Sequence, residues 1–332
     1  MHEDGSTLAA MSTLSTATSR DSFVSSLSAA GLDAPWMEPG PLIRPKASAM
    51  QASVWRWAAL EPLVRRTPEF MAPGRGAERR IVRLDNPGVP ERTSGHTISV
   101  AVQYLLPGEV APAHRHTPNA IRFMLHGEGA YTTIEGDKFV MRRGDLVVTP
   151  SMTWHDHGNE GSEPVMWTDA LDSPVVRYLE NLAMDPYEGE TQPVRTGPPA
   201  RHLHYRWETA YAELVRRSTG AADPFDDVIM EYVDPATGGS VVPALGCYLQ
   251  MLRPGVRTRA HRETSSAVYH VVAGSGATTI DGIRHPWGEG DFFAIPPRAL
   301  HAHANDGGAP AILYSVQDVP LLKRLGFYRA EA

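Results

Sequence analysis

Short apolar runs separated by turn residues dominate the chain from about Arg80 to Val176. The runs ISVAVQYLL, AIRFMLHG, GAYTTIEG and VMWTDAL are rich in β-branched and aromatic residues, and Gly, Pro, Asn or Asp lie between them. Repeated strand and turn signals of this kind are typical of antiparallel barrels and sandwiches. The same pattern returns from about Val228 to Leu322, so we predict two separate β units.

Helical periodicity is confined to three stretches, of which the first lies near the N-terminus. Ser22 is a plausible N-cap for a short helix that carries Phe23, Val24 and Leu27, and Gly31 would end it. The second stretch is apolar and helical in period, and it lies before the first β unit at residues 54–64.

The third helical stretch follows a Pro- and Gly-rich segment between the two β units. Its residues Trp207, Tyr211, Leu214 and Val215 fall on one face of a helix, and Gly220 supplies the stop. We therefore predict four parts: a helical lead at 1–78, a first barrel at 79–184, a linker with a helix at 185–227, and a second barrel at 228–332.

The two β units are related to each other by sequence. GEVAPAHRH at 108–116 matches GVRTRAHRE at 255–263, and GDLVVTPSMTWHDHGN at 144–159 matches GDFFAIPPRALHAHAN at 290–305. The offsets of the two matches are 147 and 146 residues. A fixed spacing of this kind indicates an internal duplication.

Charge and cysteine content narrow the possible functions of the 332-residue chain. A net charge of −7 argues against nucleic-acid binding, which needs a surplus of Lys and Arg. The sequence has no apolar run of membrane-spanning length and no signal peptide, so we expect no membrane association. The single cysteine, Cys247, is predicted to be a buried strand thiol, which fits a reducing compartment. We expect a cytoplasmic protein.

Three histidines carry the candidate chemistry. His114 and His116 lie two residues apart in a predicted strand, so their side chains leave on the same face, and His155 follows on a later strand. Any one of them alone would be interpreted as an ordinary hydrogen-bonded histidine. Three imidazoles that converge inside a barrel can instead ligate a divalent metal and leave positions open for substrate and oxygen.

These residues resemble the two cupin motifs. The spacing G-x5-H-x-H-x3-E-x6-G is present from Gly108 to Gly127, and G-x5-P-x-G-x2-H-x3-N is present from Gly144 to Asn159. Two positions depart from the motifs: Ala120 replaces the usual Glu, and Met152 replaces the usual Gly. Three neutral ligands would leave the metal with its full positive charge, which favours an anionic chelating substrate.

The stretches HRHTPNAIRF, GEGAYTTIEG, TPSMTWHDHGN and EPVMWTDALD resemble the gentisate 1,2-dioxygenase family, which includes salicylate, nitrosalicylate and 1-hydroxy-2-naphthoate dioxygenases. The resemblance implies an all-β bicupin of two double-stranded β-helix (jelly-roll) barrels with short helices. It also implies a homotetramer with non-haem Fe(II) at His114, His116 and His155. O2 would open the ring of a small aromatic carboxylic acid between its carboxylated and hydroxylated carbons.

The resemblance also marks four pocket residues. Arg122 would bind the substrate carboxylate through its guanidinium fork, with a rim salt bridge as the alternative. His157 would stabilise the ring hydroxyl or move its proton, or would be a structural histidine. Asp169 would orient His157 or Arg122, and Gln103 would bind substrate or oxygen. For the last two, the alternative is a barrel polar group that the backbone satisfies.

Four further residues concern the shape and charge of the cavity. Arg79 and Arg83 would close its mouth with positive charge, although a solvated basic patch is the simpler interpretation. Ser99 and Ala101 share the parity of Gln103 and should line the wall, where family members often carry an aromatic residue and a glycine. We therefore expect a substituted salicylate to be preferred over gentisate.

The second barrel has His261, Glu263 and His301 at the corresponding positions. Two histidines and a carboxylate could form a facial triad, but the family resemblance favours a remnant without metal. Two other functions stay open at this point. One is a different metal-dependent cupin enzyme, such as a diketone dioxygenase or an isomerase. The other is a non-catalytic cupin that binds or stores a ligand.

Overall fold

The computed structural model describes residues 19–41, 43, 47–71 and 80–332, which form two compact units divided after Ala47. In the first unit, helix α1 (Arg20–Ala29) is followed by the 3-10 helix η1 (Pro35–Met37). The N-cap of α1 is Ser19 and not the predicted Ser22. Ser22 is instead the third helical residue, and the two serines bond each other's backbone in a capping box.

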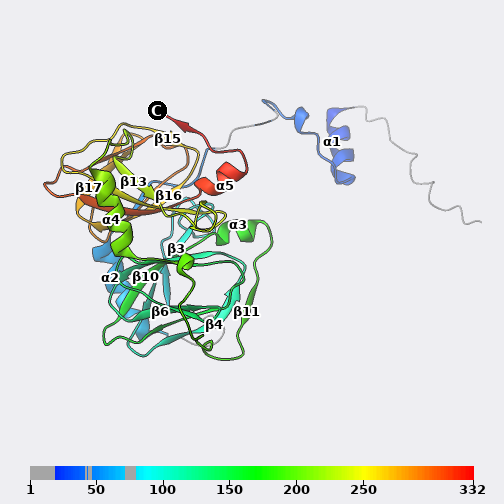
Figure 1. Ribbon diagram of the computed structural model, residues 1–332. Coiled ribbons are helices and arrows are strands. Elements are labelled where there is room, and N and C mark those ends of the chain that lie inside the picture. The colour runs from blue at the N-terminus through cyan, green and yellow to red at the C-terminus, as the bar shows by residue number, and fades with distance from the viewer. Residues whose placement is uncertain (1–18, 42, 44–46, 72–79) are drawn as a thin grey trace, which may run out of the picture. The chain divides into compact units, whose positions relative to one another are not determined.

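The first barrel is made of two sheets that face each other (Figure 1). The six-stranded sheet has the order β12-β8-β5-β10-β3-β2, and the five-stranded sheet has the order β11-β4-β9-β6-β7. Their bounds are β2 Ile81–Arg83, β3 Ser99–Leu105, β4 Val110–His116, β5 Ala120–His126, β6 Ala130–Ile134, β7 Asp137–Val140, β8 Leu146–Thr149, β9 His155–Asn159, β10 Val165–Leu171, β11 Met184–Pro186 and β12 His204–Tyr205.

The second barrel repeats this plan. Its six-stranded sheet has the order β1-β19-β16-β21-β14-β13, which matches the first sheet strand for strand, and β18-β17-β20 and β15-β22 form the remaining sheets. The bounds are β1 Ser53–Trp55, β13 Val228–Glu231, β14 Gly246–Leu252, β15 Arg262–Glu263, β16 Ala267–Ala273, β17 Ser275–Ile280, β18 Ile283–Gly288, β19 Phe292–Ile295, β20 His301–Ala304, β21 Ala311–Gln317 and β22 Ala330–Glu331. The predicted all-β fold with two related barrels is confirmed.

The helices are short, and within the described residues none has the length and apolar character to cross a bilayer. They are α2 Trp57–Arg66, η2 Thr67–Glu69, α3 Ser173–Tyr178, η3 Arg201–Leu203, α4 Trp207–Ser218 and α5 Val319–Arg324. The predicted face of α4 is partly wrong, because Tyr211 and Val215 are exposed. The residues that α4 buries are Ala210 and Leu214, one turn apart.

A strand and the N-terminus of the helix that follows it reach across from the segment before each barrel to the other barrel. Strand β1 precedes the first barrel but pairs with β19 of the second, and β12 precedes the second barrel but pairs with β8 of the first. The backbone N–H of Trp57, at the start of α2, donates to Asp291 (2.8 Å), and that of Trp207, at the start of α4, donates to Asp145 (2.8 Å). A carboxylate at a helix N-terminus satisfies a free N–H group and the helix dipole.

Glycine is required at the two positions that contact Trp57 and Trp207, the first residues of α2 and α4. A Cβ on Gly144 would lie 2.4 Å from the Trp207 ring, and one on Gly290 would lie 2.5 Å from Trp57. Both glycines also have positive φ, of 86° and 87°. The Gly-Asp pair of the second cupin motif is therefore explained by its contact with the N-terminal tryptophan of the helix that reaches across from the other barrel's leading segment.

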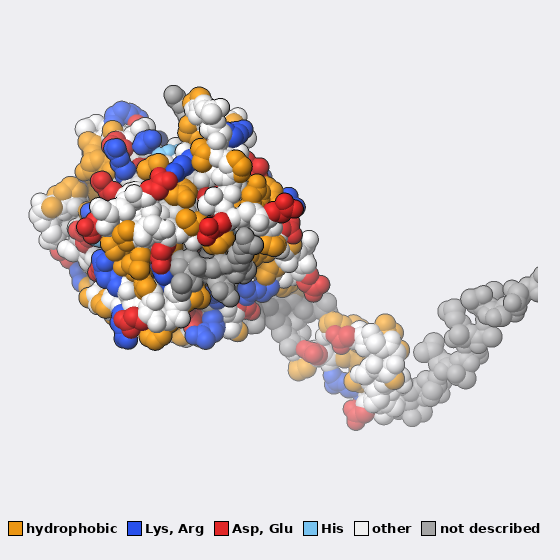
Figure 2. All heavy atoms as spheres, turned by 90° about the horizontal axis from the view of Figure 1, so that it is seen from below, with side chains coloured by type: hydrophobic (Ala, Val, Ile, Leu, Met, Phe, Trp, Pro, Cys, Tyr) orange, Lys and Arg blue, Asp and Glu red, His pale blue; other side chains and the backbone are white. Residues whose placement is uncertain are grey.

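The main hydrophobic core lies between the barrels. Alternate residues of the two six-stranded sheets meet there, among them Phe123 and Tyr314, whose rings stack with centroids 4.2 Å apart. Cys247 is buried in the same core, as predicted, and its thiol contacts the hydroxyl of Tyr314 at 3.3 Å. The other face of each sheet points into its own barrel. Figure 2 shows one outer face of the molecule, where acidic and basic side chains are interspersed.

We predict that Phe123→Ala lowers the free energy of unfolding by about 3–5 kcal/mol, because it removes a stacked ring from a close-packed core. Urea unfolding followed by fluorescence measures this loss. The control is Val140→Ala, whose side chain is 48% exposed and which should change stability by less than about 0.5 kcal/mol. Equal losses in the two variants would contradict the assignment of this core.

Candidate metal centre and substrate cavity

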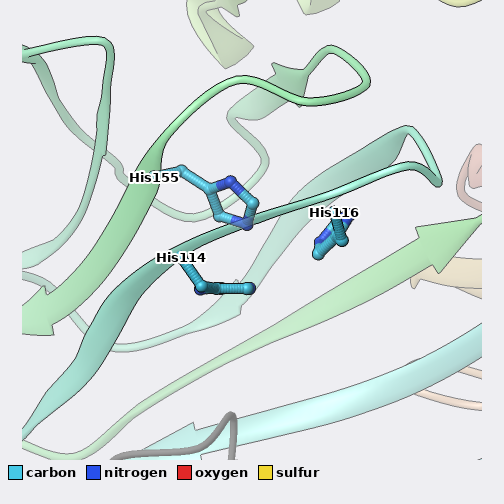
Figure 3. A group of neighbouring side chains, drawn as sticks. All are labelled: His114, His116 and His155. Atoms are coloured by element: carbon cyan, nitrogen blue, oxygen red, sulfur yellow. The ribbon is translucent and has the colours of Figure 1, made fainter. Parts of the chain in front are cut away.

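The three predicted histidines converge on one point in the first barrel. His114 and His116 project from β4, and His155 projects from the first position of β9, where it is paired in register with His114. One ligand atom from each ring lies within 4.8 Å of the other two. Figure 3 shows the three rings turned toward one another. His114 and His155 are buried, and His116 is partly buried.

Backbone carbonyls fix the orientation of the three rings. Nδ1 of His114 lies 3.1 Å from the Pro112 carbonyl, that of His116 lies 2.8 Å from Pro118, and that of His155 lies 2.9 Å from Thr153. A carbonyl oxygen only accepts, so each Nδ1 carries the proton and each Nε2 keeps its lone pair for a metal. Three neutral imidazoles on one side suit a non-haem divalent metal with open positions.

The two departures from the cupin motifs have structural counterparts. Ala120 lies on the cavity wall, where its methyl group takes the place of a fourth, anionic ligand. Met152 has a φ of 59°, the left-handed region that favours glycine, and its N–H donates to the His116 carbonyl (2.8 Å). Arg298, at the equivalent position of the second barrel, has a φ of 65°. The backbone keeps the glycine conformation without glycine.

A cavity of about 190 Å³ adjoins the histidines. Five of the predicted substrate-binding residues line it: Arg83, Ser99, Ala101, Arg122 and Asp169. The apolar residues Ile81, Leu171 and Met184 and the hydroxyl residue Ser173 complete the wall. The cavity therefore combines two guanidinium groups and the Asp169 carboxylate with apolar side chains and hydroxyl groups.

Arg122 is the buried charge of this cavity, with only 2% of the residue exposed. Its Nε lies 2.9 Å from Oδ1 of Asp169, and its Nη1 donates to the hydroxyl of Thr149. The indole N–H of Trp167 donates to the other carboxylate oxygen of Asp169 at 3.3 Å. Burial lowers the pKa of Arg122 and the charge of Asp169 opposes this shift, so the guanidinium stays charged.

His157 and Gln103 do not line the cavity. His157 is fully buried, its ring centroid lies 5.5 Å from that of His155, and its Nδ1 lies 2.9 Å from the Thr132 hydroxyl. Gln103 is fully buried on the cavity-facing side of β3, farther along the strand than Ala101. Asp169 forms an ion pair with Arg122, and the Thr132 hydroxyl contacts His157.

The mouth of the cavity is described only in part. Arg79 lies outside the described residues, so its predicted role is untested. Arg83 is exposed, and its Nη1 donates to the Arg92 carbonyl at 3.2 Å. Sequence reasoning did not identify Thr149, Thr132 or Met184. Thr149 and Thr132 could have been found from register, because they follow from the pairing of β8 with β5 and of β6 with β9.

The second barrel keeps only part of this arrangement. The rings of His261 and His301 lie 4.3 Å apart, close to the 4.2 Å that separates His114 from His155. Glu263, however, accepts hydrogen bonds from the hydroxyls of Tyr328 and Ser265. Within the described residues, the one group of His, Cys, Asp or Glu placed to hold a metal is that of the first barrel.

Comparison with known proteins identifies both barrels. The Cupin domain family model matches residues 101–171 and 248–317. The chain is 39% identical over 303 residues to 5-aminosalicylate 1,2-dioxygenase of Comamonas sp, covering 84% of this chain and 81% of that protein. It is 35% identical over 301 residues to gentisate 1,2-dioxygenase of Ralstonia sp, covering 84% of each.

Solved structures agree with these matches. The crystal structure of salicylate 1,2-dioxygenase from Pseudoaminobacter salicylatoxidans with gentisate superposes with a TM-score of 0.86 at 29% identity, over 97% of this chain and 96% of that one. The chain therefore belongs to the family of gentisate and salicylate 1,2-dioxygenases, which are bicupin proteins.

Proposed function

We propose that this protein is an Fe(II)-dependent dioxygenase that opens the ring of a salicylate-type acid between the carboxylated carbon C1 and the hydroxylated carbon C2. The observation that carries the proposal is the position of three Nε2 atoms, fixed by backbone carbonyls, beside a cavity that contains a buried guanidinium. Both atoms of O2 would enter the product, a keto-diacid. The proposal retains the predicted cytoplasmic location and homotetramer.

Different residues of the cavity would bind the carboxylate and the ring of the substrate. Arg122 would bind the substrate carboxylate, and Asp169 and Thr149 hold its side chain in place before substrate arrives. Ile81 and Leu171 would contact the apolar ring and exclude water. Bound at the three imidazoles, ferrous iron would supply the redox chemistry that lets O2 react with the ring.

The roles of His157 and Gln103 stay predictions that extend this proposal. Thr132 lies against Nδ1 of His157, so the hydroxyl would determine which nitrogen of the ring carries the proton. The second barrel has the same pair in Thr278 and His303, also at 2.9 Å. Because the pair recurs in the second barrel, the pairing itself follows from the duplication, and the role proposed for His157 is supported by its position beside His155.

The shape of the cavity supports a substituted salicylate as the preferred substrate. Ser99 and Ala101 lie on its wall, where we expect other family members to carry an aromatic residue and a glycine. A hydroxymethyl group at Ser99 and a methyl group at Ala101 would change the space that is available around a bound substrate ring. The 39% identity to a 5-aminosalicylate dioxygenase, against 35% to a gentisate dioxygenase, agrees with this preference.

We predict that wild-type protein loaded anaerobically with Fe(II) consumes oxygen with salicylates that carry a 5-amino or 5-nitro group. An oxygen electrode would compare these two compounds with salicylate, gentisate and 1-hydroxy-2-naphthoate. We expect kcat/KM for at least one substituted salicylate to exceed that for gentisate about tenfold. Gentisate far ahead of the others would defeat the specificity proposal, and no uptake with any compound would defeat the proposed reaction.

We predict that His155→Ala weakens iron binding by about 100-fold or more, because removing a direct ligand costs at least as much as removing its supporting hydrogen bond. Metal content after Fe(II) loading and desalting measures the effect. The matched control is His301→Ala, the equivalent position of the second barrel, which should keep the wild-type iron content. Equal iron in both variants would place the metal elsewhere.

We predict that Arg122→Lys lowers kcat/KM about 10- to 100-fold, because an ammonium group cannot form the fork that binds a carboxylate through two hydrogen bonds. Steady-state oxygen uptake measures the loss, which should appear mainly in KM. Arg115→Lys is the control, since Arg115 lies between two ligands but contacts Asp185 and Trp154. Wild-type kinetics in Arg122→Lys would rule out this role.

A further inference from the structure

The second barrel has a cavity of its own, of about 240 Å³, at the position equivalent to the substrate cavity. His261 and His301 line it, and their rings lie 4.3 Å apart. It reaches the surface beside Lys323, which is exposed. None of the catalytic proposals above uses this cavity.

The residues that replace the first barrel's cations reverse the charge of the second cavity. Tyr269 lies where the first barrel has Arg122, and Glu263 lies where it has His116. Glu231 pairs with Tyr248 in the same way that Arg83 pairs with Ala101, and both partners line their cavities. Two guanidinium groups and one imidazole are therefore replaced by two carboxylates and a phenol.

The imidazole of His301 presents an acceptor to this cavity. The residue is 6% exposed, and its Nδ1 donates to the Ala299 carbonyl (3.0 Å), so Nε2 on the far side of the ring holds a lone pair. Burial lowers the pKa of His301 to about 4, so the ring is neutral at neutral pH.

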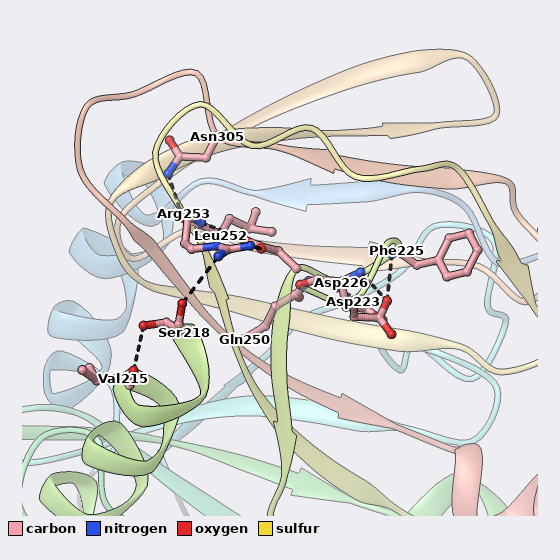
Figure 4. A network of polar contacts seen from close by, with 10 residues as sticks. Val215, Ser218, Asp223, Phe225, Asp226, Gln250, Leu252, Arg253 and Asn305 are labelled. Atoms are coloured by element: carbon pink, nitrogen blue, oxygen red, sulfur yellow. Dashed lines mark hydrogen bonds and ion pairs between the residues drawn. The ribbon is translucent and has the colours of Figure 1, made fainter. Parts of the chain in front are cut away.

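A second carboxylate is held at the cavity by a network of polar contacts (Figure 4). The carboxylate of Asp223 accepts from the backbone N–H groups of Phe225 (2.7 Å) and Asp226 (3.1 Å), which forms a tight turn. The amide of Gln250 donates to the carbonyl (2.8 Å) and to a carboxylate oxygen (3.2 Å) of Asp226. The turn holds the Asp226 carboxylate in place in the absence of any ligand.

We propose that the second-barrel cavity binds a small organic cation with ammonium-type N–H donors. Its imidazole and carboxylate acceptors would take the N–H groups, and the faces of Tyr248 and Tyr269 would contact the cation. Two cations also line the cavity: Glu213 pairs with the guanidinium of Arg217 at 2.8 Å, and Nζ of Lys323 lies over the Tyr328 ring, 5.2 Å from its centroid. A carboxylate such as the substrate of the first barrel would be repelled.

A bound metal ion fits the same residues less well. The ligand atoms of His261, Glu263 and His301 do not form a metal-holding group among the described residues. The Glu263 carboxylate instead accepts hydrogen bonds from the hydroxyls of Tyr328 and Ser265 (3.0 Å for Ser265), which hold it away from the two histidines. An ammonium group needs no such convergence, because hydrogen bonds from one nitrogen can reach acceptors on several sides.

Isothermal titration of the iron-loaded full chain tests the proposal with three four-carbon probes: putrescine, 1,4-butanediol and succinate. We expect putrescine to bind once per chain and 1,4-butanediol not to bind, and we expect any succinate bound at Arg122 in the first barrel to be unaffected by Glu263→Gln. Glu263→Gln should weaken putrescine binding at least tenfold, and His301→Ala should weaken it as well. The control Glu331→Gln makes the same charge change on β22, the strand that pairs with β15, and should bind as wild type.

The pH dependence gives an independent readout. Burial and the charges of Glu263 and Asp223 raise the pKa of Asp226 to about 7. Burial lowers the pKa of both histidines and raises the pKa of the tyrosines that line the same cavity. The other charged groups on its wall are Arg217, Glu231, Glu263 and Lys323. Asp226 is therefore the group that ionises between pH 6 and 8, and putrescine should bind several-fold more tightly at pH 8.

Three results would overturn the proposal: no saturable putrescine binding, equal binding of butanediol, or putrescine binding that survives Glu263→Gln and His301→Ala. Stoichiometric Zn²⁺ binding that both variants remove would also overturn it, in favour of a metal site. Oxygen uptake by the same variants should stay at the wild-type level. Loss of ring cleavage in the first barrel would leave this test unaffected, so the two proposals fail separately.

Discussion

The strict alternation of side chains along the six-stranded sheet of the first barrel is the constraint on which the site depends. On β5, Ile121 and Phe123 point into the core between the barrels, and Ala120 and Arg122 point into the cavity. A shift of one residue would exchange the two sets and place a guanidinium in the core. The packing of Phe123 on Tyr314 therefore also fixes the position of Arg122.

Burying that guanidinium is costly, since the penalty for a charge in the interior is several kcal/mol. The structure offsets it through Asp169, which lies directly opposite Arg122 on the neighbouring strand β10, and through Thr149 on β8. Because the register of three strands supplies these partners, the anion site is formed before any substrate binds. The histidines lie on the other side of the cavity, on β4 and β9 of the opposite sheet.

Much of this could be predicted from the sequence, and the failures have physical causes. The two-residue spacing of His114 and His116 fixes a common face, and the duplicated motifs identify two barrels. Depth along a strand is not encoded in parity, so Gln103 shares the parity of Ser99 and Ala101 without lining the cavity, and its predicted role stays a prediction. Likewise, apolar periodicity in α4 does not tell which residues of the apolar face become buried. Tyr211 and Val215 belong to that face but are exposed.

The exchange of β1 and β12 escaped prediction because strands of three and two residues have no periodic signal. It bears on the domain boundaries at 78, 184 and 227, which stay predictions, since strand pairing crosses them. Each barrel takes an edge strand from the segment that leads into the other, and its Asp145 or Asp291 binds the N-terminus of the helix that follows that strand. Removing either barrel would therefore expose a sheet edge and a helix end on the one that remains. This mutual dependence gives a reason for the second barrel to persist after its metal ligands changed, and it leaves the interior of that barrel free to acquire a cavity of opposite charge.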